Sequence, residues 1–340
     1  MPFLQLILVL LAGVSTAGQE PQVPRLRERV EVARVLVDAR VLDGGGQPVT
    51  GLGPDDFDVR IDGRRARVES AYWVGGDSAP PVPPLPGEAA TAARPDEARG
   101  RLIVFIFQKD LEPSRIVGLM RMLIETRTFL DSLGPDDRVA VLSFDSRLKI
   151  WLDFTRDLEA VREVLRRGIL FENPPRVEPV ASPSLMATLD VVRAGRAASM
   201  EDALALLGQA LEPIPRAKSV VLVGHGFGRL FGSSIVYDPS YGEARRALQA
   251  ARASVFALDV TDADSHTLEA GLQMTARDTG GFYERTHLFT KAAVNRLAGA
   301  LAGHYVLFVE VENPLDRERH EIDVRLARGR DGTVFAKRGY

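Results

Sequence analysis

The sequence contains no cysteine among its 340 residues. This absence excludes disulfide bonds, thiolate catalysis, thiolate metal sites and a lipidated N-terminal cysteine. An excess of positive charge is also missing, because 43 Lys and Arg residues are balanced by 46 Asp and Glu residues, and the two signs are interspersed along the chain. We therefore expect no nucleic-acid binding.

Long apolar runs are absent beyond the N-terminus, so the mature chain contains no candidate for a membrane-spanning helix of about 20 residues. Residues 1–13 form an apolar stretch too short to span a bilayer, and small residues follow it up to Ala17. This pattern predicts a signal peptide over 1–17 and hence an exported protein, in the periplasm, the cell envelope or the medium. Since no Lys or Arg precedes the apolar run, an uncleaved anchor or an incorrectly assigned start codon remains an alternative.

Alternating apolar and polar residues predict strands at both ends of the chain. The N-terminal group, 28–74, includes a hairpin signal at Asp62-Gly63 followed by a single return strand over 66–73. The C-terminal group, 304–340, predicts three further strands. Each group has too few strands for an independent sandwich, so we expect them to pair as a small β-sandwich-like domain.

The middle of the chain has two parts of different composition. Residues 75–100 are dominated by Pro, Ala and Gly, which predicts an extended, disordered linker; a proline-rich recognition motif is the alternative. Residues 101–303 alternate between strands and helices, which predicts an α/β domain with a doubly wound, mostly parallel sheet. The short turn between 138–144 and 148–152 requires an antiparallel pair, so one edge strand should run against the others.

This order of elements resembles the von Willebrand factor type A (VWFA) domain. Four phrases are similar to a VWFA-related family abundant in Acidobacteria: 47–52 with Asp55-Asp56-Phe57, 133–141, 278–281 and 337–340. The resemblance covers about 30–340. It implies a Rossmann-like fold and an exported or envelope-associated protein whose biochemical role is largely uncharacterised.

VWFA domains hold a divalent cation at a metal-ion-dependent adhesion site (MIDAS), and the resemblance implies where its ligands would fall here. Gln108 takes the place of the first aspartate, Ala198 or Ser199 that of the threonine, and His225 that of the second aspartate. Mg²⁺ is a hard cation that requires anionic oxygen, which a carboxamide and an imidazole do not supply. The sequence therefore predicts a degenerate MIDAS with no metal and no cofactor. Ser199 has a structural interpretation too, as the N-cap of a helix that begins at Met200.

A shifted cation site is an alternative, because Asp110, Glu112 and Ser114 repeat the alternate spacing of the adhesion motif. In a structural interpretation, Asp110 and Glu112 are acidic residues that favour the positive N-terminus of a helix over 114–133, with Pro113 in its first turn. The second interpretation is favoured because His225 would still lie opposite the ion.

His225 also raises an enzyme hypothesis, since 224–228 (Gly-His-Gly-Phe-Gly) is similar to the oxyanion loop of α/β-hydrolases. Such a hydrolase needs a Gly-x-Ser-x-Gly elbow, which this chain lacks, and its histidines show no i, i+4 pairing. We therefore expect a non-enzymatic protein, in which the glycines permit a tight loop with His225 partly exposed.

The expected binding face consists of the loops at the ends of the parallel strands: 108–114, 168–199, 225–240 and 261–266. The loop 225–240 is rich in aromatic residues, which favours contact with a protein partner at the cell envelope; a loop folded back on its own core is the alternative. The predicted function is metal-independent protein binding or adhesion. The predicted binding residues are Gln108, Asp110, Ser199, His225, Phe227, Phe231 and Tyr237.

Overall fold

The computed structural model describes residues 32–75, 100–232, 234–312 and 320–340. The predicted signal peptide and nearly all of the predicted linker lie outside these residues. Within the described ranges, no helix combines the length and the apolar character that crossing a membrane requires.

A six-stranded sheet forms the centre of the larger unit, with strand order β12-β11-β8-β5-β6-β7. All neighbouring strands are parallel except β6 and β7, which are antiparallel. The predicted mostly parallel sheet with one antiparallel edge strand is therefore confirmed. The strands are β5 (Leu102–Gln108), β6 (Arg138–Phe144), β7 (Leu148–Thr155), β8 (Lys218–Gly224), β11 (Ala253–Asp259) and β12 (Tyr283–Arg285).

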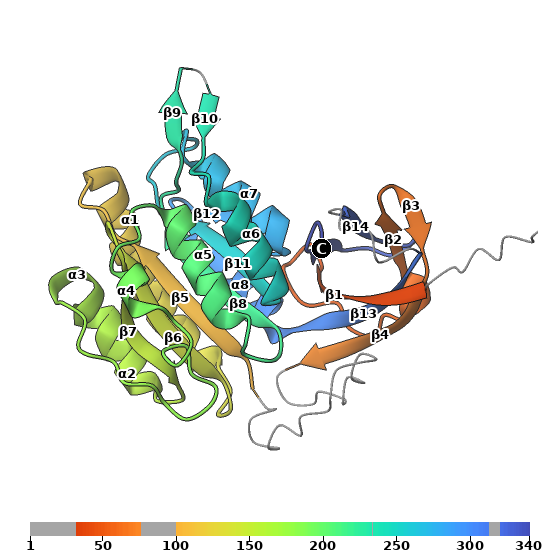
Figure 1. The fold of residues 1–340 in the computed structure, drawn as a ribbon, viewed down its shortest axis with the longest axis horizontal. Helices are drawn as coiled ribbons and strands as arrows, with labels where there is room; N and C mark the ends of the chain where they lie inside the picture. Colours follow the sequence, from red (N-terminus) through yellow and green to blue (C-terminus); the bar gives the residue numbers. More distant parts are fainter. Residues whose placement is uncertain (1–31, 76–99, 233, 313–319) are drawn as a thin grey trace, which may run out of the picture.

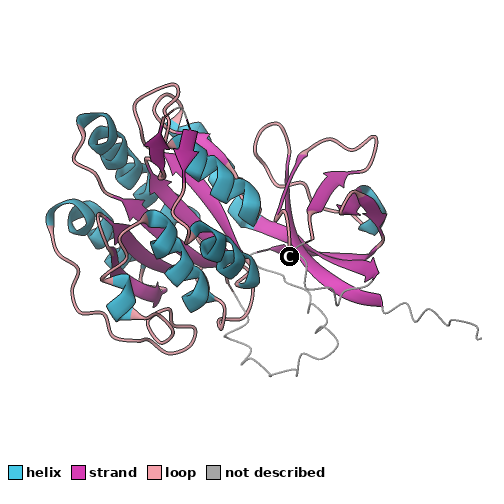
Figure 2. Ribbon diagram, turned by 45° about the horizontal axis from the view of Figure 1, so that its top comes forward, coloured by secondary structure: helices cyan, strands magenta, loops and turns pink. Residues whose placement is uncertain are grey.

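Helices cover both faces of this sheet (Figure 2). Successive residues of β5 point to opposite faces, so Ile103 packs in one core and Val104 in the other. Helices α1, α2 and α8 contribute to the core around Ile103, and α5, α6 and α7 to the core around Val104. The helices are α1 (Pro113–Phe129), α2 (Leu158–Glu163), α3 (Ile169–Phe171), α4 (Val191–Ala194), α5 (Met200–Leu211), α6 (Tyr241–Ala250), α7 (Glu269–Thr279) and α8 (Thr290–Ala302).

Strands from the two ends of the chain pair with one another in a second unit (Figure 1). One sheet has the order β15-β1-β13-β4 and the other the order β14-β2-β3. In each sheet an N-terminal strand pairs with a C-terminal strand, β1 with β13 and β2 with β14, both antiparallel. The strands are β1 (Val32–Leu42), β2 (Phe57–Ile61), β3 (Arg64–Ala66), β4 (Val68–Gly75), β13 (Gly303–Glu312), β14 (Ile322–Leu326) and β15 (Thr333–Ala336).

The single return strand predicted over 66–73 is wrong, because the chain there divides between the two sheets. The turn at Asp62-Gly63 joins β2 to β3 as expected, with positive φ angles of 50° and 77°. After β3 the chain leaves this sheet, and β4 pairs with β13 in the other. There the ring of Trp73 lies edge-on against Tyr305, with centroids 5.0 Å apart. This long-range packing decides the strand's partner, and a hairpin signal carries no information about it.

A two-stranded hairpin, β9 (Arg229–Phe231) and β10 (Ser234–Val236), occupies part of the segment that we expected to be a loop. It projects from the top of the α/β unit in Figure 1, beyond the ends of the central strands. Strands of three residues are too short to give a periodic signal in the sequence.

Buried polar contacts connect the two units. The guanidinium of Arg40, on β1, donates hydrogen bonds to the hydroxyl oxygens of Ser254 and Ser219, at 2.7 and 3.2 Å. Arg252, which precedes β11, pairs with Asp38 of β1 at 2.6 Å. Each pair joins β1 to the start of a strand in the central sheet, so the base of that sheet is fixed against the second unit.

Candidate functional site

The C-terminal ends of β5, β8, β11 and β12, with the loops that follow them, form one edge of the central sheet, which we call the crest. Gln108 is the last residue of β5, His225 follows β8 and Asp259 ends β11. In open α/β sheets, ligands bind at this edge. The structure therefore brings Gln108 and His225 together there, as the sequence predicted.

Gln108 is bound to the loop that follows β8. Its side-chain Oε1 accepts hydrogen bonds from the backbone N–H groups of His225 and Gly226, at 3.0 and 3.1 Å. Its Nε2 donates to the carbonyl of Gly226 at 2.8 Å, and the side chain is buried. We call these three contacts the Gln108 bridge. A Cβ atom at Gly224 would overlap with this carboxamide, which explains a glycine at the end of β8.

His225 is buried, with 8% of its surface exposed, so the expectation that it would be partly exposed is wrong. Its loop turns inward at Gly226, where φ is 93°, and the backbone there packs against Leu268. Burial and the charge of Arg115 lower the pKa of His225 to about 4, although Asp110 acts in the opposite direction. The imidazole is therefore neutral at physiological pH.

Asp110, which belongs to the alternative, shifted cation site, already has partners within the chain. Asp110 forms an ion pair with Arg115 and accepts the backbone N–H of Glu112 at 3.0 Å. Burial acts to raise the pKa of Asp110, but these two contacts and His225 outweigh it and lower the pKa below its usual value. Glu112 immediately precedes Pro113, the first residue of α1, in agreement with the structural interpretation of this segment. Within the described residues, neither carboxylate belongs to a group of three metal-ligating side chains.

Ser199 is the N-cap of α5, and its side-chain oxygen accepts the backbone N–H of Asp202 at 3.1 Å. The capping interpretation is therefore confirmed. The hydroxyl oxygen provides an acceptor for a backbone N–H group of the first helical turn, as is typical of Ser at this position.

The predicted aromatic binding residues divide into two groups. Phe227 is only 5% exposed and packs beside Tyr237 and Tyr241, with ring centroids 6.4 and 6.5 Å away. Phe227 thus belongs to the core under the hairpin, which does not support its prediction as a contact residue, whereas Tyr237 is partly buried and packs against this core. Phe231, at the end of β9, is 78% exposed and is available for contact.

A polar cluster at the end of β11 was not predicted from the sequence. Asp259 is 1% exposed, and its Oδ2 lies 2.7 Å from Nε2 of His266 and 2.8 Å from the hydroxyl of Tyr283. The Tyr283 hydroxyl also donates to Glu269 at 3.1 Å. Only the His-x-x-Glu spacing of His266 and Glu269, just after a buried strand, could have indicated it.

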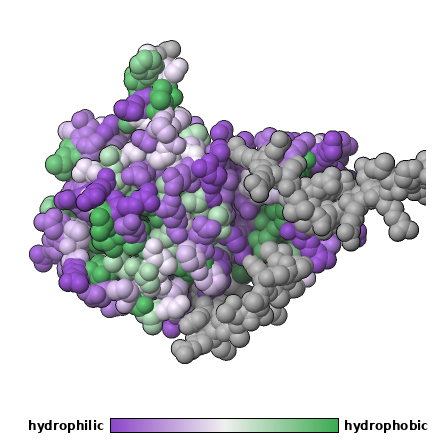
Figure 3. Space-filling view, viewed as in Figure 1, coloured by the Kyte–Doolittle hydropathy of each residue, from purple (hydrophilic) through white to green (hydrophobic). Residues whose placement is uncertain are grey.

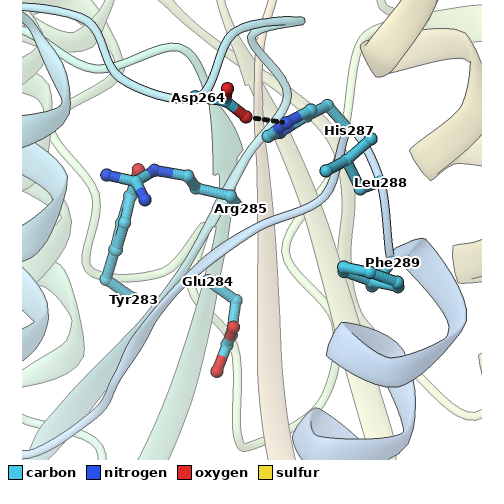
Figure 4. Close-up of a pocket in the computed structure, with 7 residues that line it drawn as sticks. All are labelled: Asp264, Tyr283, Glu284, Arg285, His287, Leu288 and Phe289. Carbon is cyan, nitrogen blue, oxygen red and sulfur yellow. Dashed lines mark hydrogen bonds and ion pairs between the residues drawn. The ribbon is translucent and has the colours of Figure 1, made fainter.

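A hollow of about 540 Å³ opens beside this cluster (Figure 4). The ring of His287 faces Asp264 there, with Nε2 3.2 Å from Oδ1. Leu288 and Phe289 are 66% and 71% exposed at the same hollow. Its lining residues are Asp264, Tyr283, Glu284, Arg285, His287, Leu288 and Phe289.

No protein-family model and no curated protein matches the sequence. Among solved structures, the chain is similar to a von Willebrand factor type A protein from Catenulispora acidiphila, at 11% identity and a TM-score of 0.41, covering 85% of this chain and 74% of that one. It is also similar to the conserved hypothetical protein BatB from Bacteroides thetaiotaomicron, at 15% identity and a TM-score of 0.38, covering 58% of this chain and 98% of that one.

A further match is an aerotolerance-related membrane protein from Bacteroides fragilis, at 12% identity and a TM-score of 0.36, covering 59% of this chain and 96% of that one. At these TM-scores the matches carry no functional argument. The mostly parallel sheet of the chain and its antiparallel edge strand are those expected from the resemblance in sequence. The chain therefore has the α/β architecture that the resemblance to VWFA domains implies.

Proposed function

We propose that this chain is a non-enzymatic binding module that contacts a protein partner through the β9–β10 hairpin at the crest. The observation that carries the proposal is the exposure of three apolar side chains on this projecting hairpin: Leu230 at 61%, Phe231 at 78% and Val236 at 46%. Figure 3 shows the hydrophobic surface at the tip of the projection. Exposed aromatic and aliphatic side chains of this kind act as anchors in protein interfaces.

We further propose that binding does not require a cation at the MIDAS position. The Gln108 bridge supports this, because a neutral carboxamide at the end of β5 is already hydrogen-bonded to the loop after β8. A neutral imidazole follows on the other strand. The two strand ends thus supply no carboxylate of their own, and Mg²⁺ needs anionic oxygen ligands.

The hydrolase alternative receives little support from the geometry around His225. The imidazole is buried and neutral, and its Nε2 lies 3.7 Å from Asp110. In the part of the chain that is described, no Ser or Thr hydroxyl is hydrogen-bonded to this ring, whereas a nucleophile activated by His should be within about 3.2 Å.

Export to the cell envelope stays a proposal based on the N-terminal sequence.

A capture experiment tests the proposed interface. The chain would be immobilised and incubated with an envelope extract, as wild type and as Phe231→Asp, with and without EDTA. Burying a Phe side chain contributes about 2 kcal/mol, so we expect Phe231→Asp to lower capture of the partner at least roughly tenfold. EDTA should leave capture unchanged.

Phe171→Asp is the matched control, because Phe171 is 75% exposed and lies at the end of α3, far from the hairpin in Figure 1. Capture by this variant should equal that of wild type. Equal capture by Phe231→Asp would contradict the proposed surface, and loss of capture in EDTA would contradict metal independence. Turnover of a generic ester that is lost in His225→Ala would favour the hydrolase.

A further inference from the structure

We propose that Asp259, His266 and Glu269 form a binding site for a zinc-class transition-metal dication. Each residue offers one ligand atom, and the three atoms lie within 4.8 Å of one another. An ion bonded at roughly 2.0–2.2 Å to all three would need side-chain movements of less than about 1 Å. We call this group the Asp259 triad. It is distinct from the MIDAS position at Gln108 and His225, and the inference goes beyond the proposed function.

The backbone already presents the three side chains to one point. Asp259 ends β11, and its Oδ1 accepts the backbone N–H of Thr261 at 2.9 Å. Glu269 is the first residue of α7, and its backbone N–H donates to the carbonyl of His266 at 3.3 Å. This turn places His266 and Glu269, three residues apart, on the same side of the helix start. Binding therefore requires little ordering of the chain.

The types of ligand select the class of metal. One imidazole nitrogen and two carboxylate oxygens suit Zn²⁺ and similar transition metals, which take three protein ligands and one open position. Mg²⁺ prefers oxygen ligands throughout, so the imidazole of His266 disfavours it. We expect Zn²⁺ to bind and Mg²⁺ not to compete.

The carboxylates of Asp259 and Glu269 converge on one hydroxyl group, that of Tyr283. The hydroxyl oxygen of Tyr283 lies 2.8 Å from Asp259 and 3.1 Å from Glu269, and its single hydrogen is shared between these two acceptors. Arg285 pairs with Glu269 from the exposed side, at 3.0 Å. Nε2 of His266 is 2.7 Å from Asp259. A dication bound to Nε2 of His266 would replace this hydrogen bond, and the neutral imidazole would carry its hydrogen on Nδ1.

Neighbouring polar atoms also lack partners. Oγ1 of Thr261 and Nδ1 of His225 are buried and have no hydrogen-bond partner among the described residues. Both residues are 8% exposed, and the backbone N–H of Thr261 donates a hydrogen bond to the side chain of Asp259. Buried polar groups without a partner are uncommon, and they indicate a polar ligand at this end of the sheet. Tyr283, whose hydroxyl contacts Asp259, also lines the neighbouring hollow.

Calorimetric titration of the metal-free, full-length chain with ZnCl₂ tests the site. We expect one Zn²⁺ per chain, with a Kd in the micromolar range or tighter, unaffected by excess Mg²⁺. Glu269→Gln and His266→Asn should each weaken the affinity at least tenfold. The matched controls are Glu243→Gln on α6 and His320→Asn beside β14, which should bind as wild type does.

Co²⁺ provides a second readout that needs no variant, because a four-coordinate site with one imidazole gives visible absorption that a surface-bound ion does not. Substoichiometric Zn²⁺ binding, a six-coordinate Co²⁺ spectrum, or equal affinity in Glu269→Gln and His266→Asn would each overturn the proposal. The partner-capture experiment is independent of this one. A negative result in one of these two experiments therefore does not contradict the proposal that the other experiment tests.

Discussion

The side-chain oxygen of Gln108 accepts a hydrogen bond from the backbone N–H of His225 at 3.0 Å, and so ties the end of β5 to the loop that follows β8. In the VWFA resemblance these are the positions of two aspartates that hold a cation. Here a carboxamide, which can both donate and accept, connects the same two strand ends. The bridge thus supplies a direct contact at the place where the resemblance implies an ion.

Gln108→Ala should destabilise the fold because it leaves the N–H groups of His225 and Gly226 buried without an acceptor. An unsatisfied buried donor costs about 1–3 kcal/mol, so we expect a loss of roughly 2–4 kcal/mol in the free energy of unfolding. Urea denaturation followed by circular dichroism measures it. Gln209→Ala removes a half-buried glutamine of α5 that bonds only to the exposed Glu243 and Arg193 side chains among the described residues, and it should change stability by less than about 0.5 kcal/mol.

Gly226→Ala should lower the free energy of unfolding more than the replacement of a glycine that has open space around it. Gly226 has φ of 93°, and an added Cβ would overlap with the carbonyl of Leu268. Gly51 has a similar φ of 79° but nothing within 4 Å of an added Cβ. Gly51→Ala therefore measures backbone strain alone, about 1–2 kcal/mol, and Gly226→Ala should exceed it by at least about 1 kcal/mol. Equal losses in the two variants would mean that the loop moves freely away from Leu268.

His225 should make the fold sensitive to acid. Its pKa is lowered from 6.5 to about 4, so between these values the unfolded chain binds a proton that the folded chain does not. The contribution of His225 to the free energy of unfolding is thus fully present above pH 6.5. It decreases as the pH falls, and on the order of 3 kcal/mol has been lost by pH 4. Comparing unfolding free energies at pH 7 and pH 4.5 for wild type and His225→Gln measures this contribution. An equally steep loss of stability in wild type and His225→Gln would contradict the prediction.

The long buried elements could be predicted from the sequence. The apolar run of β6 and the capped, periodic helix α5 have the predicted boundaries, because burial and the Ser199 cap are local signals. Features that depend on distant residues could not be predicted in this way. Burial of His225 depends on packing against Leu268, and the Asp259 triad contacts Tyr283, which lies 24 residues after Asp259 in the sequence. A sequence pattern predicts which residues lie at a strand end, but it does not predict which of their atoms form hydrogen bonds within the protein.

Lys218 should make stability rise from neutral to alkaline pH. It begins β8 with 2% of its surface exposed, and its Nζ donates to the carbonyl of Ala251 at 2.7 Å. Burial, together with the nearby charge of Arg252, lowers its pKa from 10.5 to about 7, and Asp38 offsets only part of this effect. The folded chain therefore disfavours the charged form of this amine.

Between pH 7 and pH 10.5 the unfolded chain keeps the Lys218 proton that the folded chain has released, so the free energy of unfolding increases with pH across this window. Below pH 7 both states are protonated and the cost of burying the charge is complete, on the order of 4 kcal/mol. Lys218→Met removes the charge and keeps the length of the side chain. We expect this variant to be at least as stable as wild type at pH 6.5 and to lack the increase between pH 7 and pH 9.5, as measured by urea denaturation. The matched control is Lys291→Met on α8, a lysine in an exposed position, which should retain the increase. A wild-type chain whose stability is flat over this interval would show that the Lys218 amine stays charged in the folded protein.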